Sequence, residues 1–151
     1  MPVDEQARLK VLDEAGWKPD RRVSTAEQER VLSENGFAFW SDLAAFLAQY
    51  DGLTLRFVRR RSRRSDAVKL DACWAATVAD AEWVTRYSER TAARLAPVGA
   101  AYSEHLLIWL AEDGRFFGTY DALVGELGRT PSQLLDTLLN ERIELRDTDV
   151  L

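Results

Sequence analysis

The chain has 151 residues, of which 46% are apolar and 30% charged, and its formal net charge is −5. This size fits a single domain over residues 1–151 with a hydrophobic core of its own, and the composition excludes a disordered chain. A lone cysteine excludes an internal disulfide, and no apolar run approaches the length of a membrane span. We therefore expect a cytoplasmic protein without a membrane partner.

Three helices are predicted in the first third of the chain. The first spans Asp4–Ala15, where apolar residues recur at helical spacing. The second follows in STAEQERVLSENG, where Ser24 and Glu27 have the spacing of a capping box and Gly36 would end the helix. The third is expected between Trp40 and Gly52, with one stripe of large apolar side chains.

The hydrophobic period then changes from helical to alternating. Leu53–Arg59 alternates as a half-buried strand does, and the stretch AVKLDA is predicted to be its antiparallel partner. A longer helix is predicted from about Val78 to Arg94. Pro97 and Gly99 are expected to close that segment.

The stretch HLLIWLAEDGRFFGTYD, residues 105–121, predicts a hairpin. Apolar and aromatic runs flank an Asp-Gly pair, which is a strong turn signal. The stretches DALVGELG and PSQLLDTLLNERI are predicted as two short helices, with Asp121 as an N-cap and Pro131 in a first turn. The element order indicates an α+β fold: a single domain with a mostly antiparallel central sheet flanked by helices. Core positions of the sheet are expected among Leu107, Trp109, Phe116 and Tyr120.

Residues that could carry chemistry are few. Glu104 would point to the opposite strand face from His105, the only histidine, so the two are not expected to form a catalytic pair. Cys73 lies among apolar residues and is predicted to be a small buried side chain. One histidine and one cysteine are too few for a structural zinc site. We expect no catalytic residue, metal or cofactor, with an enzyme built around His105 as an alternative.

Charge is distributed unevenly along the chain. Residues 53–70 carry seven basic and one acidic side chain, whereas residues 71–151 carry seven basic and fourteen acidic ones. The loop Arg59–Arg64 could contact phosphates, or it could be a solvated hairpin loop. The acidic balance elsewhere disfavours nucleic acid as a partner and fits a basic protein better.

Several stretches resemble one protein family in their order and spacing. They are LDEAGWKPDRRV, ENGFAFWSDLAAFLAQYDGLTLRF and ERTAARLAPVGAAYSEHLLIWLAEDGRFFGTYDALVGELG, and together they cover about Leu12 to Leu139. They resemble the third group of immunity proteins in the SUKH superfamily. Two departures stand out: Asp51 replaces the first glycine of a frequent pair, and AAYSEH replaces a usually glycine-rich lead into a strand.

The resemblance implies an α+β fold and a function without catalysis. Such a protein binds and neutralises a toxin of a polymorphic toxin system, commonly a nuclease, by stoichiometric association. It would act as a monomer or weak homodimer. Charge and expected exposure suggest contact residues around the hairpin end and the following predicted helix, with one exposed tryptophan as anchor: Glu112, Asp113, Asp121, Glu126, and Trp40 or Trp83. A nucleic-acid-binding or regulatory module using Arg59–Arg64 is the alternative function.

Overall fold

The computed structural model describes residues 2–148, with side chains from residue 5 onward. The elements in this part of the chain are α1 (Pro2–Glu14), α2 (Ala26–Glu34), α3 (Ser41–Tyr50), β1 (Thr54–Val58), β2 (Ser65–Lys69), α4 (Ala72–Val78), α5 (Ala81–Thr91), β3 (Leu95–Ala101), β4 (Leu106–Ala111), β5 (Phe116–Tyr120), β6 (Leu123–Gly128), α6 (Pro131–Leu139) and β7 (Arg146–Asp147).

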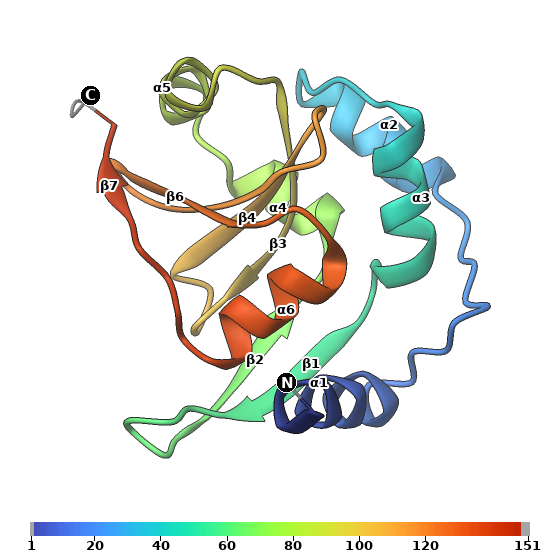
Figure 1. Cartoon of the computed structure of the whole chain (residues 1–151). Coiled ribbons are helices and arrows are strands. Elements are labelled where there is room, and N and C mark those ends of the chain that lie inside the picture. The colour runs from blue at the N-terminus through green and yellow to red at the C-terminus, as the bar shows by residue number, and fades with distance from the viewer. Residues whose placement is uncertain (1, 149–151) are drawn as a thin grey trace.

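The seven strands form one sheet in the order β1 to β7, and every neighbouring pair is antiparallel. Each inner strand therefore pairs with the strands before and after it in the sequence, and β1 and β7 form the two edges. Helices pack against this sheet (Figure 1). The predicted α+β fold with a mostly antiparallel central sheet flanked by helices is confirmed.

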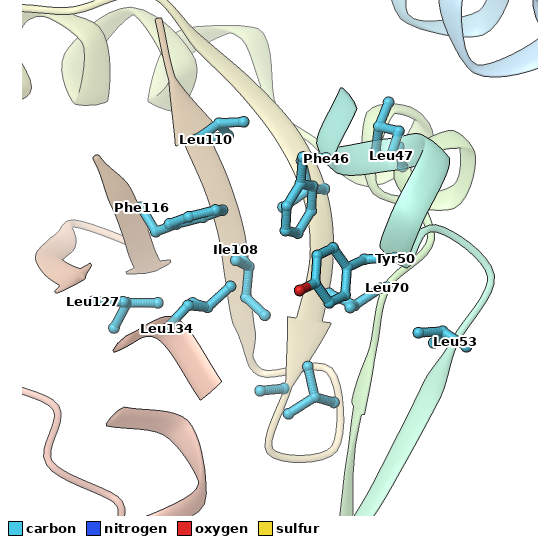
Figure 2. Close-up of a cluster of buried hydrophobic side chains, with 14 of the residues drawn as sticks. Phe46, Leu47, Tyr50, Leu53, Leu70, Ile108, Leu110, Phe116, Leu127 and Leu134 are labelled. Atoms are coloured by element: carbon cyan, nitrogen blue, oxygen red, sulfur yellow. The ribbon is translucent and has the colours of Figure 1, made fainter. Parts of the chain in front are cut away.

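The two faces of the sheet carry separate hydrophobic clusters, because successive strand residues point to opposite sides. Ile108 and Leu110 of β4 face the larger cluster, where they meet side chains of α3, β5 and α6 (Figure 2). Trp109 faces the smaller cluster with Tyr87 of α5 and Phe117 of β5.

The predicted core positions of the hairpin divide into buried and exposed ones. Trp109 and Phe116 are buried, at 0% and 2% exposure, which confirms them as core. Leu107 is half-buried. Tyr120, the last residue of β5, is 46% exposed and is therefore not a core position.

The N-terminal half follows the predicted pattern closely, with two shifts. The N-cap of α2 is Thr25, whose side chain makes no cap hydrogen bond, and the N–H of Ala26 donates to Ser24 Oγ at 3.4 Å. The predicted Ser24–Glu27 capping box is therefore wrong, because α2 begins one residue later than that box requires. The stretch AVKLDA ends as helix rather than strand, because Asp71 caps α4 by accepting from the N–H of Trp74 at 3.0 Å.

Asp51 also helps to place the start of α4. Its carboxylate is buried and accepts from the N–H of Ala72 and from Gln28 Nε2, both at 2.9 Å. The side chain that replaces a frequent glycine of the resembled family thus ties α2, α3 and α4 together.

The segment containing Pro97 and Gly99 is a fully buried strand, β3, and not the close of a helix. Pro97 is tolerated because β2 pairs with β3 only at Ala100 and Ala101, beyond the proline. A shift in the register with β4 occurs between Pro97 and Gly99. Gly99 is required by close packing, since a Cβ there would lie 2.2 Å from the backbone oxygen of Lys69.

DALVGELG forms strand β6, so the predicted helix is wrong. Asp121 has a φ of 48° and occupies the tight turn between β5 and β6 instead of capping a helix. Gly125 lets the chain pass close by, because a Cβ there would lie 2.1 Å from the backbone oxygen of Glu144. The second predicted helix is confirmed as α6, with Pro131 in its first turn and Thr130 as N-cap.

The chain ends are tied together across the fold. Arg8 of α1 donates through one nitrogen to both carboxylate oxygens of Asp136 in α6, at 2.8 and 2.7 Å. These residues are 128 positions apart, so this pair joins the first and last helices of the structure.

Candidate functional site

An open groove of about 450 Å³ lies between α4, α5, the β3–β4 loop and the adjoining ends of β4 and β5. We call it the aromatic groove, because five of its lining residues are aromatic: Trp74, Trp83, Tyr87, Trp109 and Tyr120. Three carboxylate side chains also line it, those of Asp80, Glu104 and Asp121.

The floor of the aromatic groove is fixed by hydrogen bonds and ring packing. Trp109 Nε1 donates to Thr119 Oγ1 at 2.8 Å, and the Tyr87 hydroxyl donates to the backbone oxygen of Asp121. The Tyr87 ring lies edge-on to Trp109, with centroids 5.8 Å apart, and stacks on Trp83 at 6.1 Å. The buried polar atoms of the floor are therefore satisfied, and its shape is set before any partner binds.

Exposed apolar side chains stand at the rim of the aromatic groove. Val78 is 48% exposed and Tyr120 is 46% exposed, and both belong to the few large apolar side chains this accessible. The rings of His105 and Tyr120 are nearly perpendicular, with centroids 6.2 Å apart. Exposed apolar groups gathered beside polar ones are typical of interaction surfaces.

A strained turn borders the aromatic groove at the β3–β4 loop. Tyr102, Ser103 and Glu104 all have positive φ, at 55°, 57° and 68°. The left-handed conformation costs L-residues roughly 1–2 kcal/mol each and is seldom adopted in succession. These residues fall in the stretch AAYSEH, where the resembled family is usually glycine-rich.

Three contacts hold the strained turn in place. The N–H of Ser103 donates to Asp66 Oδ1 at 3.0 Å, and the Tyr102 hydroxyl donates to the oxygen of Leu138 at 2.6 Å. Lys69 Nζ lies 2.5 Å from Glu104 Oε1. Strained backbone that surrounding contacts maintain is frequently found at functional sites.

The three groove carboxylates differ in their partners. Asp80 is the N-cap of α5 and accepts from the N–H groups of Glu82 and Trp83. Glu104 pairs with Lys69. Asp121 has no ion pair among the residues that the structure describes, and no lysine or arginine lines the groove. The aromatic groove therefore has a negative lining, in which only the Asp121 carboxylate has neither an ion pair nor a backbone N–H donor among the described residues.

The structure separates the contact residues proposed from the sequence into distinct regions. Trp83 and Asp121 both line the aromatic groove. Glu112 and Asp113 lie in the β4–β5 turn, at the opposite end of the hairpin from Asp121. Glu126 lies on strand β6, near that turn, and not on a helix as predicted.

Arginines accompany each carboxylate near the β4–β5 turn. Glu112 pairs with Arg94 at 2.8 Å, and Asp113 pairs with Arg115 at 2.7 Å. The Arg115 side chain beside Asp113 holds the pKa of that carboxyl below its usual range. Glu126 similarly lies 3.6 Å from Arg129. The negative charge of the turn is consequently offset, unlike that of Asp121.

Trp40 lies apart from Trp83. It is the N-cap residue of α3, is half-buried and packs against the larger hydrophobic cluster. Its Nε1 is buried, with no hydrogen-bond partner in the described part of the chain. Trp83 packs against the smaller cluster, so the two tryptophans belong to different packing regions.

The residues considered for catalysis are not assembled into a reactive cluster. The Glu104 carboxylate pairs with Lys69, and His105 is exposed against Tyr120. Burial, followed by the nearby Asp51, Glu27 and Asp71 carboxylates, raises the pKa of the Cys73 thiol to about 11, so the reactive thiolate is scarce. Within residues 2–148, no three potential metal ligands gather in one place.

The β1–β2 connection containing Arg59–Arg64 extends away from the sheet (Figure 1). Arg59 is used structurally: its guanidinium lies 4.9 Å from the ring centroid of Tyr102 and 3.8 Å from carboxylate oxygens of Asp66 and Glu141. The N–H of Arg60 donates to Glu141 Oε1 at 2.8 Å. The start of the loop is thus anchored to the body of the protein.

The groove itself was not predictable from the sequence. Trp74 and Val78 lie on α4, which was not predicted; Val78 was expected to begin the following helix, so nothing indicated that the two would line one groove. Tyr120 was expected among core positions. The available signal was its place at the end of a strand next to the turn at Asp121, where side chains are more often accessible.

A protein-family model described as "SUKH-3 immunity protein" matches residues 5–141. No curated protein and no solved structure gives a match. Among the described residues, no helix combines the length and apolar character needed to cross a membrane.

Proposed function

The chain belongs to the SUKH-3 immunity protein family, and on this premise we propose that it neutralises its cognate toxin by binding it stoichiometrically in the cytoplasm. The toxin is a nuclease-type domain of a polymorphic toxin system. The protein acts as a monomer or weak homodimer, and it forms no catalytic intermediate with its partner.

The family match carries this proposal, because it spans nearly the whole chain. The site geometry supports binding over catalysis. The aromatic groove offers accessible apolar groups and carboxylates on a preformed floor, while His105 lacks a carboxylate partner in the described residues. Preformed pockets with a few polar groups suit recognition.

Charge supports a nuclease as the target. Residues 71–151 carry fourteen acidic and seven basic side chains, and this region supplies all the described lining residues of the aromatic groove. Nucleases bind a polyanion and therefore present basic surfaces. An acidic inhibitor gains association rate and specificity against such a surface.

The test is co-expression with the toxin domain encoded beside the gene of this protein. Cells that make both proteins are expected to survive, and the two are expected to co-purify in a fixed ratio. An unrelated toxin domain serves as the control. Killing of cells that contain soluble, folded immunity protein would count against the proposal.

The absence of catalysis has its own test. His105→Gln removes the only histidine side chain and keeps a polar group at the groove edge. Protection is expected to persist in this variant. If the variant still bound the toxin but no longer protected the cell, a catalytic role of His105 would have to be considered.

A DNA-binding assay on the isolated protein tests the alternative function, in which Arg59–Arg64 forms a nucleic-acid-binding loop. Phosphate contacts by several arginines would give tight binding that weakens steeply with salt. We expect no such binding, since Arg59 is engaged with Tyr102, Asp66 and Glu141.

A further inference from the structure

Resting on the proposed function, we propose that the aromatic groove receives a lysine or arginine side chain of the toxin, held between the Asp121 carboxylate and the Tyr120 ring. The partner of this groove is thus a basic segment of a protein. Neighbouring apolar groups of that segment contact Val78 and Trp74 at the rim.

The first argument is charge complementarity. Among the described residues, the lining contains three carboxylates and no lysine or arginine. Asp80 is occupied as a helix cap and Glu104 is paired with Lys69, whereas the Asp121 side chain has no ion pair in the described residues. Asp121 is therefore the groove carboxylate that a partner cation can use.

The second argument is the position of the aromatic rings. A cation gains energy over the face of an aromatic ring, and the gain increases when water is excluded. Trp83 already has the Arg86 guanidinium 4.9 Å from its ring centroid. Tyr120 is 46% exposed and lines the same groove as Asp121. A cation bound by Asp121 can therefore also contact the Tyr120 ring.

The third argument is that both groups are held in place. The backbone of Asp121 accepts a hydrogen bond from the buried Tyr87 hydroxyl. Tyr120 ends strand β5 and packs in a T-shaped arrangement with His105, which follows the strained turn over Tyr102–Glu104. A partner side chain thus meets groups whose positions are set in advance, which lowers the entropic cost of binding.

The experiment measures binding of the toxin domain encoded beside the gene, in a catalytically inactivated form, by isothermal titration calorimetry. Asp121→Asn removes the charge but keeps a side chain that tolerates the φ of 48°. Tyr120→Ala removes the exposed ring. Each variant is expected to weaken binding by about 10-fold or more, as removal of a contact in a charged interface does.

Two matched variants serve as controls. Asp113→Asn makes the same chemical change at the other end of the hairpin, where Arg115 already pairs with the carboxylate. Val58→Ala truncates another accessible apolar side chain, 57% exposed, on strand β1. Both should bind within about 2-fold of the wild type, and the melting temperature of all four variants verifies folding.

The outcomes separate the two proposals. If the wild-type protein does not bind the toxin, the proposed function fails and the groove proposal fails with it. If the wild type binds and Asp121→Asn binds less than threefold more weakly, only the groove proposal is overturned. If only Tyr120→Ala weakened toxin binding, the groove would receive an apolar side chain of the toxin instead of a basic one. If only Asp113→Asn weakened toxin binding, the toxin would contact the β4–β5 turn instead of the groove.

Discussion

The indole nitrogen of Trp109 donates a hydrogen bond of 2.8 Å to the hydroxyl of Thr119. The two residues belong to the paired strands β4 and β5, and both are almost wholly buried. Removing the Trp109 side chain therefore leaves a cavity and removes one hydrogen bond of the Thr119 hydroxyl. Trp109→Ala is expected to lower the free energy of unfolding by about 3–5 kcal/mol, a large part of the roughly 5–15 kcal/mol typical of a domain. Urea denaturation measures this loss. Trp109→Phe should lower the free energy of unfolding by less, because most of the ring volume remains. A melting temperature of Trp109→Ala near that of the wild type would contradict the prediction.

Gly99 should not accept alanine. The added Cβ would lie 2.2 Å from the Lys69 backbone oxygen, so β2 and β3 would have to separate. We expect Gly99→Ala to destabilise the protein by about 2–3 kcal/mol, near the upper end for overpacking. Gly118→Ala is the control, because its Cβ would meet only side-chain atoms of Leu127 and Leu106, at 3.0–3.1 Å. Chemical denaturation should rank Gly99→Ala as clearly worse, and the reverse order would show that the backbone contact can relax.

Ser103→Gly is expected to stabilise the protein. The residue has a φ of 57°, a conformation that costs an L-residue roughly 1–2 kcal/mol. The greater freedom of glycine in the unfolded chain costs about 0.4–1 kcal/mol, so the net gain should be about 0.5–1 kcal/mol. Ser132→Gly, in helix α6, should change stability in the opposite direction. Thermal melting of both variants measures the difference, and a lower melting temperature for Ser103→Gly would contradict the strain argument.

Asp51 should make stability fall as pH rises over part of the acidic range. Burial raises the pKa of its carboxyl, against the effects of the Ala72 and Gln28 hydrogen bonds. The folded protein therefore holds this proton more tightly than the unfolded chain, and the stabilisation by protonation is lost between the ordinary aspartate pKa, roughly 4, and the raised one. Relative to Asp51→Asn, the wild type should lose stability with rising pH through that window and show a constant difference above it.

Asp113 provides the opposite case for the same measurement. The neighbouring Arg115 lowers the pKa of the Asp113 carboxyl. The stability that this carboxylate contributes is therefore present above the ordinary aspartate pKa and is lost as pH falls through the lowered pKa. Between these two pKa values, the wild type should gain stability relative to Asp113→Asn as pH rises. The gain should be small because Asp113 is exposed. Urea denaturation at several pH values checks both signs, and equal slopes for the two variants would contradict the assignment.

The elements with clear periodicity were predictable from the sequence. The alternation in Leu53–Arg59 and the Asp-Gly turn of the central hairpin both lead directly to the observed strands. Strand β3 was not predictable, because Pro97 and Gly99 normally interrupt strands. Only tertiary structure shows that the proline lies beyond the pairing with β2, and that Gly99 lets the Lys69 backbone approach.

The groove depended on information that local patterns do not contain. The stretch after Asp71 is too short and too uniformly apolar to distinguish a one-to-two-turn helix from a strand end, so the position of Trp74 was unknown. Exposure and aromatic character pointed to Trp83, and charge pointed to Asp121. That these two face one groove follows from the packing of α5 on β4 and β5, and the short strand β6 was mistaken for a helix.

The neighbour-to-neighbour order of the strands has a consequence for folding kinetics. Each strand joins an edge formed by the strand just before it. Loop closure is short within β1–β2 and along β3 to β6, so its entropic cost there is low, whereas helices separate β2 from β3 and β6 from β7. The sheet can therefore grow in the order in which the chain is synthesised. The contact between Arg8 and Asp136 spans 128 positions and must wait until α6 exists. Truncating Arg8 should accordingly speed unfolding while leaving the refolding rate almost unchanged, as for a contact made after the rate-limiting step.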